Sequence, residues 1–267
     1  MGVSVAVLAS GSRGNCALVS SSRTRVLVDA GISCRETFKR LKAAGDEPRT
    51  LSAILITHEH NDHVYGLLTL AKRLAVPVFM TGATHHAWSK MMRDEAGAAP
   101  QLSRLEAFAA GKTFTIGDIA VAAFTIPHDA ADPVGFTFRA EGIKVAIATD
   151  LGYLPRNVCD HLQGCDVLVL ESNHDTEMLR GGPYPWSVKQ RVMSRVGHLS
   201  NEDLADFFSS DYDGSASYVV LAHLSERNNH PELARRAAEK ALGPRRTLLQ
   251  NRVMLAAQLE AMEVIRL

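Results

Sequence analysis

An α+β fold is predicted by three features of this 267-residue sequence. Strand and helix patterns alternate over residues 3–80, the pattern changes towards strands over residues 113–138, and several apolar runs end abruptly in polar side chains. Side chains that follow buried strands are delivered to a rigid sheet edge. The sequence therefore predicts a mixed fold whose strand ends carry the functional residues.

Size and composition indicate a globular chain. At 29.0 kDa, with 46% hydrophobic and 22% charged residues, it can form a substantial core, and no composition break marks a linker. We expect a single domain over residues 1–267. The formal net charge is +0, so any attraction to nucleic acid must come from a local patch.

The expected setting is cytoplasmic and away from membranes. Residues 1–10 are apolar but too short for a membrane span, and they lack the basic start of a secretory signal. The cysteines are few and have no metal-binding spacing; they are Cys16, Cys34, Cys159 and Cys165. A reducing compartment accounts for them most simply.

Strand candidates are short apolar or β-branched runs bounded by turn-forming residues. They lie at residues 3–8, 25–28, 53–56, 76–80, 113–116, 119–126, 134–138, 143–148, 167–170 and 217–222. The C-terminal run over residues 253–265 is also apolar, and we expect a closing strand or a strand pair there.

Helix candidates combine apolar spacing with recognisable ends. They lie at residues 34–44, 65–74, 85–92, 185–196, 202–208 and 231–242. Gly45 is expected to end the first helix and Gly243 the last, and Ser200 or Asn201 is expected to cap the helix at 202–208.

The segment THEHNDH at residues 57–63 follows the apolar run 53–56 and contains four side chains suited to binding metal. His58 and His60 are two apart and share one side of an extended segment, whereas Asp62 and His63 follow once the chain has begun to turn. One turn could therefore serve two metals. Imidazole and carboxylate suit Zn, Mn, Fe or Ni, and the absence of a nearby Cys argues against a closed structural zinc site. A solvated polar turn is the alternative.

The loop at residues 9–15 is too rich in Gly and Ser for a regular element. Its small residues would let backbone N–H groups approach a phosphate, with Ser12, Arg13 and Asn15 as contacts. A simple turn between strands explains the loop equally well, because it lacks the lysine signature of a P-loop.

The pattern H-x-H-x-D-H at residues 58–63 resembles that of the metallo-β-lactamase fold superfamily. The resemblance implies a four-layered αββα sandwich with this motif at its edge and further ligands on later loops. His128, Asp150 and His223 each lie at or just after the end of a predicted strand and match the third, fourth and fifth motifs. Asp29 would support the metal-binding histidines from behind, although it could merely cap the following turn.

The resemblance implies two divalent metal ions as cofactors, Mn or Zn, with Fe or Ni as further options. One ion would be held by His58, His60 and His128 and the other by Asp62, His63 and His223, with Asp150 bridging them. A hydroxide shared by the two ions would attack the substrate, so hydrolysis is the implied reaction. His85, His86 and His174 are not counted as ligands.

Phosphoester chemistry is favoured over antibiotic hydrolysis, because true β-lactamases usually carry Cys where this chain has Asp150. Besides Asp62, the expected catalytic residues are Glu171 and His198, which resemble a Glu and His pair that phosphodiesterase branches use beside the metals. There the histidine contacts the scissile phosphate or protonates the leaving oxygen. Alternatively, His198 only orders its loop.

The segment between Glu177 and Glu202 is basic and has aromatic residues within it. It contains Arg180, Tyr184, Trp186, Lys189, Arg191, Arg195 and His198. The segment could follow a phosphate backbone and stack a base, with Lys189 and Arg191 as substrate contacts. It could equally be a core-packed helix with a solvated basic side, since valines recur every four residues.

The motifs at residues 8–15, 171–175, 184–186 and 197–201 resemble the WalJ (YycJ) branch of the superfamily. That resemblance implies a DNA exonuclease acting from the 5′ end with a divalent metal such as Mn, and DNA rather than RNA as the partner. The oligomeric state is left open. The alternatives are a small-molecule (cyclic) phosphodiesterase, a thioester hydrolase of the glyoxalase II type, and a non-catalytic binding protein that keeps the fold.

Overall fold

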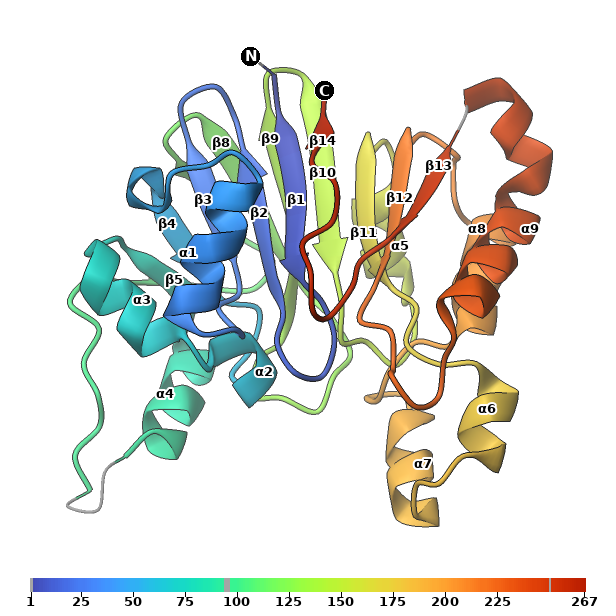
Figure 1. Cartoon of the computed structure of the whole chain (residues 1–267), viewed down its shortest axis with the longest axis horizontal. Helices are drawn as coiled ribbons and strands as arrows, with labels where there is room; N and C mark the ends of the chain where they lie inside the picture. The colour runs from blue at the N-terminus through green and yellow to red at the C-terminus, as the bar shows by residue number, and fades with distance from the viewer. Residues whose placement is uncertain (1, 94–96, 250) are drawn as a thin grey trace.

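The structure, a computed structural model, describes residues 2–93, 97–249 and 251–267. Two β-sheets pack face to face, and helices lie on the outer side of each sheet (Figure 1). The layers therefore run helix, sheet, sheet, helix. This arrangement confirms the predicted α+β sandwich of four layers.

Over the described residues, the first sheet has seven strands in the order β14, β1, β2, β3, β4, β5, β6. Their bounds are β1 Ser4–Ala9, β2 Cys16–Ser20, β3 Arg25–Val28, β4 Ala53–Leu55, β5 Val78–Thr81, β6 Leu105–Phe108 and β14 Ile265–Arg266. Strands β1 to β3 pair antiparallel, and β3 to β6 pair parallel. The carboxyl ends of β3 and β4 therefore meet at one edge.

The second sheet, counted over the same ranges, has seven strands in the order β13, β12, β11, β10, β9, β8, β7. Their bounds are β7 Thr113–Ile116, β8 Ile119–Thr125, β9 Val134–Ala140, β10 Ile143–Ala148, β11 Val167–Glu171, β12 Tyr218–Ala222 and β13 Arg252–Leu255. Strands β10 to β13 pair parallel. The carboxyl ends of β10, β11 and β12 thus lie together.

The helices form the two outer layers and the edge that carries the site. Those beside the first sheet are α1 Cys34–Ala43, α2 Asn61–Val64, α3 Leu67–Leu74 and α4 Gly82–Met91, with a short 3₁₀ turn at Pro48–Thr50. Those beside the second sheet are α5 Arg156–Leu162, α6 Thr176–Gly181, α7 Trp186–Val192, α8 Asn201–Ser210 and α9 Pro231–Leu249. Of the helices in the described ranges, none has the length and apolar composition needed to cross a bilayer.

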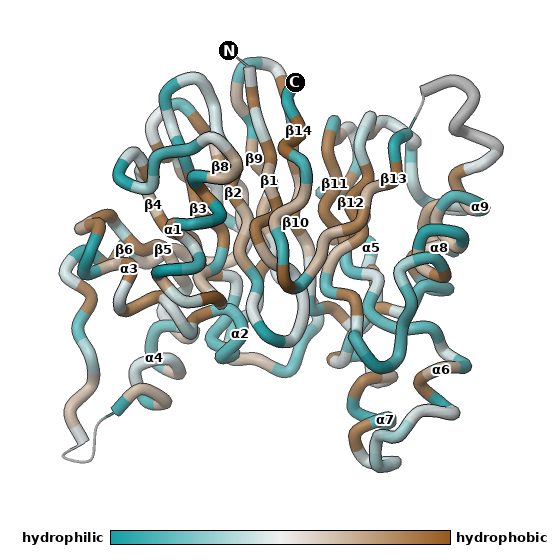
Figure 2. Tube along the Cα trace, in the orientation of Figure 1, coloured by the Kyte–Doolittle hydropathy of each residue, from teal (hydrophilic) through white to brown (hydrophobic). Residues whose placement is uncertain are grey.

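The core consists of one apolar layer between the sheets and one beneath each helix layer. Val26 and Val28 pack between the sheets, whereas Leu27 faces the helices. The same alternation places Val169 between the sheets and Leu168 towards the helices. Hydrophobic residues consequently run along the strands of both sheets, while many loop and helix residues are hydrophilic (Figure 2). Burial on both faces explains why these strands are continuous apolar runs in the sequence.

Several expected boundaries were wrong. Helix α9 continues through Gly243 to Leu249, because a single glycine costs a helix only about 1 kcal/mol and does not stop it. Helix α7 ends at Val192 rather than at residue 196. The C-terminal run forms two strands, but β13 pairs with β12 and β14 with β1, so they belong to different sheets. Strands β2 and β6 and helices α5 and α6 were not predicted.

Three backbone segments meet closely at the edge that carries the site. The Gly31 N–H donates to the Asn15 carbonyl at 2.9 Å, and the Asn15 N–H donates to the Asp62 carbonyl at 2.7 Å. A Cβ atom on Gly31 would lie 1.6 Å from the Asp62 carbonyl oxygen. Only glycine therefore lets the three segments approach this closely.

Gly31→Ala is expected to lower the free energy of unfolding by about 1–3 kcal/mol, because its methyl group pushes the 60–63 loop away. Urea denaturation measures this loss. The matched control is Gly82→Ala, since a Cβ atom there meets nothing within 4 Å. Equal stability of the two variants would contradict the close packing of Gly31.

Candidate metal centre

The candidate site lies where carboxyl ends of strands from both sheets converge. Asp29 follows β3, the 57–63 segment follows β4, and Asp150 follows β10. Glu171 ends β11, and His223 follows β12. Buried strands on each side fix these positions, so the side chains are held by the rigid part of the fold.

The first cluster consists of His58, His60 and His128. One nitrogen from each ring lies within 4.8 Å of the others. The His128 Nε2 atom is 3.2 Å from His60 Nδ1, and the Nε2 atom of His58 is buried without a hydrogen-bond partner. Buried polar atoms are almost always satisfied, so an orphaned imidazole nitrogen facing two others fits a bound cation.

The second cluster consists of Asp62, His63, Asp150 and His223, whose ligand atoms also lie within 4.8 Å of one another. His63 Nε2 is 3.2 Å from an Asp150 carboxylate oxygen. His223 Nε2 is 3.6 Å from Asp62, beyond hydrogen-bonding distance, and is buried without a partner. Together the two clusters hold all seven predicted ligands, and their donors fit divalent metal ions.

Burial and neighbouring charges shift the pKa values of groups in both clusters. Burial alone would raise the pKa of Asp150, but the nearby His223 and His63 hold that pKa well below its usual range. Burial of His58, with His63 beside it, lowers the pKa of the His58 ring. A neutral imidazole and an ionised carboxylate are the forms that bind metal.

Glu171 connects two histidines at the rim of the clusters. Its Oε1 atom accepts from His198 Nδ1 and from His223 Nδ1, both at 2.8 Å. Its Oε2 atom accepts from the backbone N–H of Leu151 at 2.8 Å. Although burial opposes ionisation, the two histidines hold the pKa of Glu171 at about 2. Because Nδ1 of each ring is engaged, Nε2 of each ring is left to act.

Asp29 lies directly behind the ligands. Its Oδ2 atom is 2.8 Å from His63 Nδ1, and its Oδ1 atom accepts from the Thr57 backbone N–H at 2.9 Å. The Thr57 hydroxyl is in turn 3.0 Å from His58 Nδ1. Asp29 and Thr57 thus orient one histidine of each cluster.

Asp29→Asn is expected to weaken divalent metal binding about 10- to 100-fold, because His63 loses the anionic partner that orients its ring. Titration of the metal-free protein with Mn²⁺ measures the change. Asp160→Asn is the matched control, since Asp160 pairs with Arg156 at the surface. Equal Mn²⁺ affinities for the two variants would reduce Asp29 to a turn-capping residue.

Three residues of the site adopt left-handed backbone conformations. The φ angles are 60° for Asp29, 63° for Asp150 and 54° for His223. Non-glycine residues rarely adopt such angles, and aspartate tolerates them better than most. Each residue comes directly after a strand, so the chain turns sharply as it presents the side chain to the site.

The predicted substrate contacts lie in different surroundings. Asn15 points inward, where its Nδ2 atom is 3.2 Å from Asp62 Oδ2. Ser12 is exposed, and Arg13 pairs with Glu226 at 2.6 Å. The Lys189 ammonium is buried and donates to the Arg180 carbonyl at 2.7 Å. Arg191 remains at the surface.

Arg191 is linked to a metal ligand through Asp129. It pairs with Asp129 at 2.6 Å, and Asp129 is 3.5 Å from His128 Nε2. The pair lies beside the first cluster. Helix α7 is therefore linked to the loop that carries His128.

Sequence reasoning missed several supporting residues. The Ser10 hydroxyl accepts from the His223 backbone N–H at 2.7 Å. Buried Asn173, Asn201 and Asn229 link the loops that carry Glu171, His198 and His223; for example, Asn201 Nδ2 donates to Asn229 Oδ1 at 2.9 Å. The polar runs at residues 171–175 and 197–201 were the sequence signal for Asn173 and Asn201. The sequence does not show which distant residues these side chains contact. His85, His86 and His174 join none of the metal-binding groups found among the described residues.

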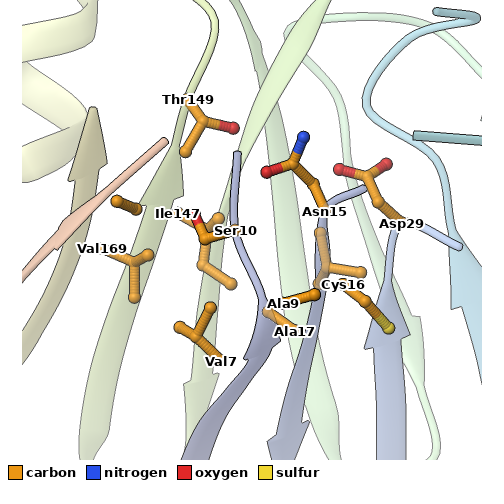
Figure 3. A pocket seen from close by; sticks show the side chains of 12 residues that line it. Val7, Ala9, Ser10, Asn15, Cys16, Ala17, Asp29, Ile147, Thr149 and Val169 are labelled. Atoms are coloured by element: carbon orange, nitrogen blue, oxygen red, sulfur yellow. The ribbon is translucent and has the colours of Figure 1, made fainter. Parts of the chain in front are cut away.

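A small cavity lies between the sheets, directly beneath the site (Figure 3). Its volume is about 20 Å³, enough for one water molecule. Ser10, Asn15, Asp29 and Thr149 form its polar part, whereas Val7, Ala17 and Val169 form its apolar part. The cavity is too small for a substrate.

The comparisons with known proteins agree with this geometry. Residues 24–224 match the model of the beta-lactamase superfamily domain. The chain is 40% identical over 242 residues to the exodeoxyribonuclease YycJ of Bacillus anthracis, covering 91% of this chain and 90% of that one. It is 36% identical over 234 residues to the exodeoxyribonuclease WalJ of Streptococcus pneumoniae, covering 88% and 86% of the two chains.

The fold has a counterpart among solved structures. The metallo-β-lactamase fold protein YhfI of Bacillus subtilis superposes with a TM-score of 0.71 at 16% identity, covering 98% of this chain and 100% of that one. The predicted class, a metal-dependent hydrolase, is confirmed. The chain belongs to the metallo-β-lactamase superfamily, in the branch that includes YycJ and WalJ.

Proposed function

We propose that the protein is a dinuclear metal-dependent phosphodiesterase that acts as a DNA exonuclease, removing nucleotides in the 5′ to 3′ direction. The observation that carries the proposal is the meeting of two ligand clusters beside the Glu171–His198 pair. Two metal sites next to a histidine proton donor suit the cleavage of an ester with a poor leaving group. The same clusters support the assignment of His58, His60 and His128 to one ion and of Asp62, His63 and His223 to the other.

Two bound divalent cations would polarise the phosphoryl oxygens and lower the pKa of the attacking water. Asp62, a half-buried member of the second cluster, takes up the proton that this water loses. His198 gives the proton on Nε2 to the leaving oxygen as the P–O bond breaks. Glu171 stabilises the protonated ring and raises the pKa of His198, although burial opposes it. The centroid of the His198 ring lies 5.3 Å from that of His128 in the first cluster and 5.2 Å from that of His223 in the second.

DNA as the substrate is supported by the names of the relatives, since YycJ and WalJ are both called exodeoxyribonucleases. Two arginines of the basic segment already have partners within the fold. Arg180 pairs with Glu177, and Arg195 stacks on Tyr153 at 4.1 Å. On α7 the proposed contacts for DNA are Trp186, which is 62% exposed, and Arg191, which pairs with Asp129 but stays exposed at the surface.

We further propose Mn or Zn as the metal, with Fe or Ni as other options, because His and Asp ligands suit all four. A cytoplasmic setting is supported by the cysteines. All four are free thiols buried in the fold. A reducing compartment preserves that state.

Release of end label from double-stranded DNA, single-stranded DNA and RNA by the Mn-loaded protein tests the proposal. The protein is expected to release label from DNA, 5′ label first, and His60→Ala is expected to release none. Cleavage of bis(p-nitrophenyl) phosphate without cleavage of any polymer would replace the exonuclease with a small-molecule phosphodiesterase. Failure to hydrolyse either substrate would reject both.

A further inference from the structure

A cavity of about 170 Å³ lies beside His198, on the side of the site formed by the second sheet. It is lined by Gly152, His174, Thr176, Met193, His198, Ser200 and Asp203. These residues come from the loop after β10, the start of α6, the turn after α7 and the start of α8. The cavity is therefore built from several elements that also position the catalytic groups.

The cavity adjoins the reacting centre through His198 itself. Because Nδ1 of this ring is bonded to Glu171, its Nε2 atom is available to a bound molecule. Gly152, also in the lining, follows Asp150 by two residues, and a Cβ atom on Gly152 would lie 2.4 Å from the backbone of Arg195. This close backbone contact holds the loop after Asp150 against the turn that carries Met193.

The lining indicates an uncharged occupant. No lysine or arginine is among the described residues that line the cavity, and the carboxylate of Asp203 belongs to its wall, where it accepts from the Ser200 hydroxyl at 2.7 Å. Met193 contributes an apolar surface. The Asp203 carboxylate disfavours a phosphate group at this position, because the His198 ring in the lining is already paired with Glu171.

His174 has a ring nitrogen that makes no hydrogen bond within the protein. Its side chain is 3% exposed, and its Nδ1 atom is buried without a hydrogen bond. Buried ring nitrogens are normally satisfied. An unsatisfied nitrogen on a residue that lines a cavity indicates a ligand that brings a hydrogen-bonding group of its own.

We propose that this cavity binds the nucleoside attached to the leaving oxygen of the scissile phosphate. The metal clusters hold the phosphate, His198 faces the leaving oxygen, and the sugar and base extend past His198 towards His174 and Met193. A wall that combines the apolar Met193 with the hydrogen-bonding side chains of Thr176 and Ser200 and with the Asp203 carboxylate matches a base and its deoxyribose better than it matches a phosphate. The inference rests on the proposed function, because it takes the phosphate to be bound at the clusters.

Binding of small ligands to the Mn-loaded protein tests the proposal directly. The probes are inorganic phosphate, thymidine 3′-monophosphate and thymidine 5′-monophosphate, with calorimetry as the readout. One of the two nucleotides is expected to bind at least about 10-fold tighter than phosphate, and the tighter one identifies which sugar oxygen leaves. Met193→Phe, which fills the cavity, is expected to reduce this preference about 10-fold.

Met91→Phe is the matched control, because Met91 is 48% exposed on α4, outside the cavity lining. His174→Leu is the second variant and keeps the test valid if Met193→Phe does not fold; it is also expected to reduce the preference. Equal binding of phosphate and both nucleotides would overturn the proposal, as would an unchanged preference in a folded cavity variant. A preference in a protein that leaves DNA uncut would instead reject the exonuclease and keep the nucleoside site.

Discussion

Replacing Asp150 by alanine is expected to reduce hydrolysis by on the order of 10³-fold or more. The Asp150 carboxylate is 2% exposed and lies 3.2 Å from His63 and 3.4 Å from His223. It is the predicted bridge between the two metal ions. Without it, one negative charge is lost where two cations must be held close together.

The fold is expected to survive this change with a small loss of stability. Asp150 has a φ angle of 63°, which alanine adopts at a cost of about 1–2 kcal/mol. Asp150→Asn tolerates the same backbone angle and keeps the side-chain shape while removing the charge, so its loss of activity should be similar with less loss of stability. Initial rates on bis(p-nitrophenyl) phosphate and thermal unfolding separate the two effects. Full activity in either variant would contradict the bridging role.

His198→Ala is expected to slow the cleavage of DNA by about 10²- to 10⁴-fold. The reason is that the leaving oxygen of DNA belongs to an alcohol and needs a proton as the P–O bond breaks. The p-nitrophenolate anion leaves without a proton. The same variant is therefore expected to lose much less activity on bis(p-nitrophenyl) phosphate.

Rates on both substrates, measured with the same Mn-loaded preparations, decide between two roles for His198. His86→Ala is the control, because His86 is exposed on α4 and joins none of the described ligand groups. Equal losses on DNA and on bis(p-nitrophenyl) phosphate would show that His198 only orders its loop. A selective loss on DNA would identify it as the proton donor.

The fold was predictable because its strands are buried on both faces. Such strands are continuous apolar runs that stop at polar residues, and residues 53–56, 167–170 and 218–222 have this form. The resemblance of the 58–63 motif then implied the layer order, which the structure confirms. Strand β6 was missed because it is largely exposed and its LEAF sequence has no alternating pattern.

The ligands of the site were easier to predict than their supports. Histidine and aspartate at strand ends are conspicuous in a sequence, and the structure brings all seven predicted ligands into two clusters. The contacts of Ser10 to His223 and of Asn15 to Asp62 join residues far apart in the chain. Only the folded chain makes such pairs visible. Lys189 shows the converse, since a lysine counted as a surface charge donates to a carbonyl inside the fold.

The most direct test of two-metal hydrolysis is a titration of the metal-free protein with Mn²⁺, in which the rate of bis(p-nitrophenyl) phosphate hydrolysis is followed against metal bound per chain. The account predicts that the rate stays low through the first equivalent and rises to its maximum as the second binds. A full rate at one equivalent, or hydrolysis without any metal, would contradict it.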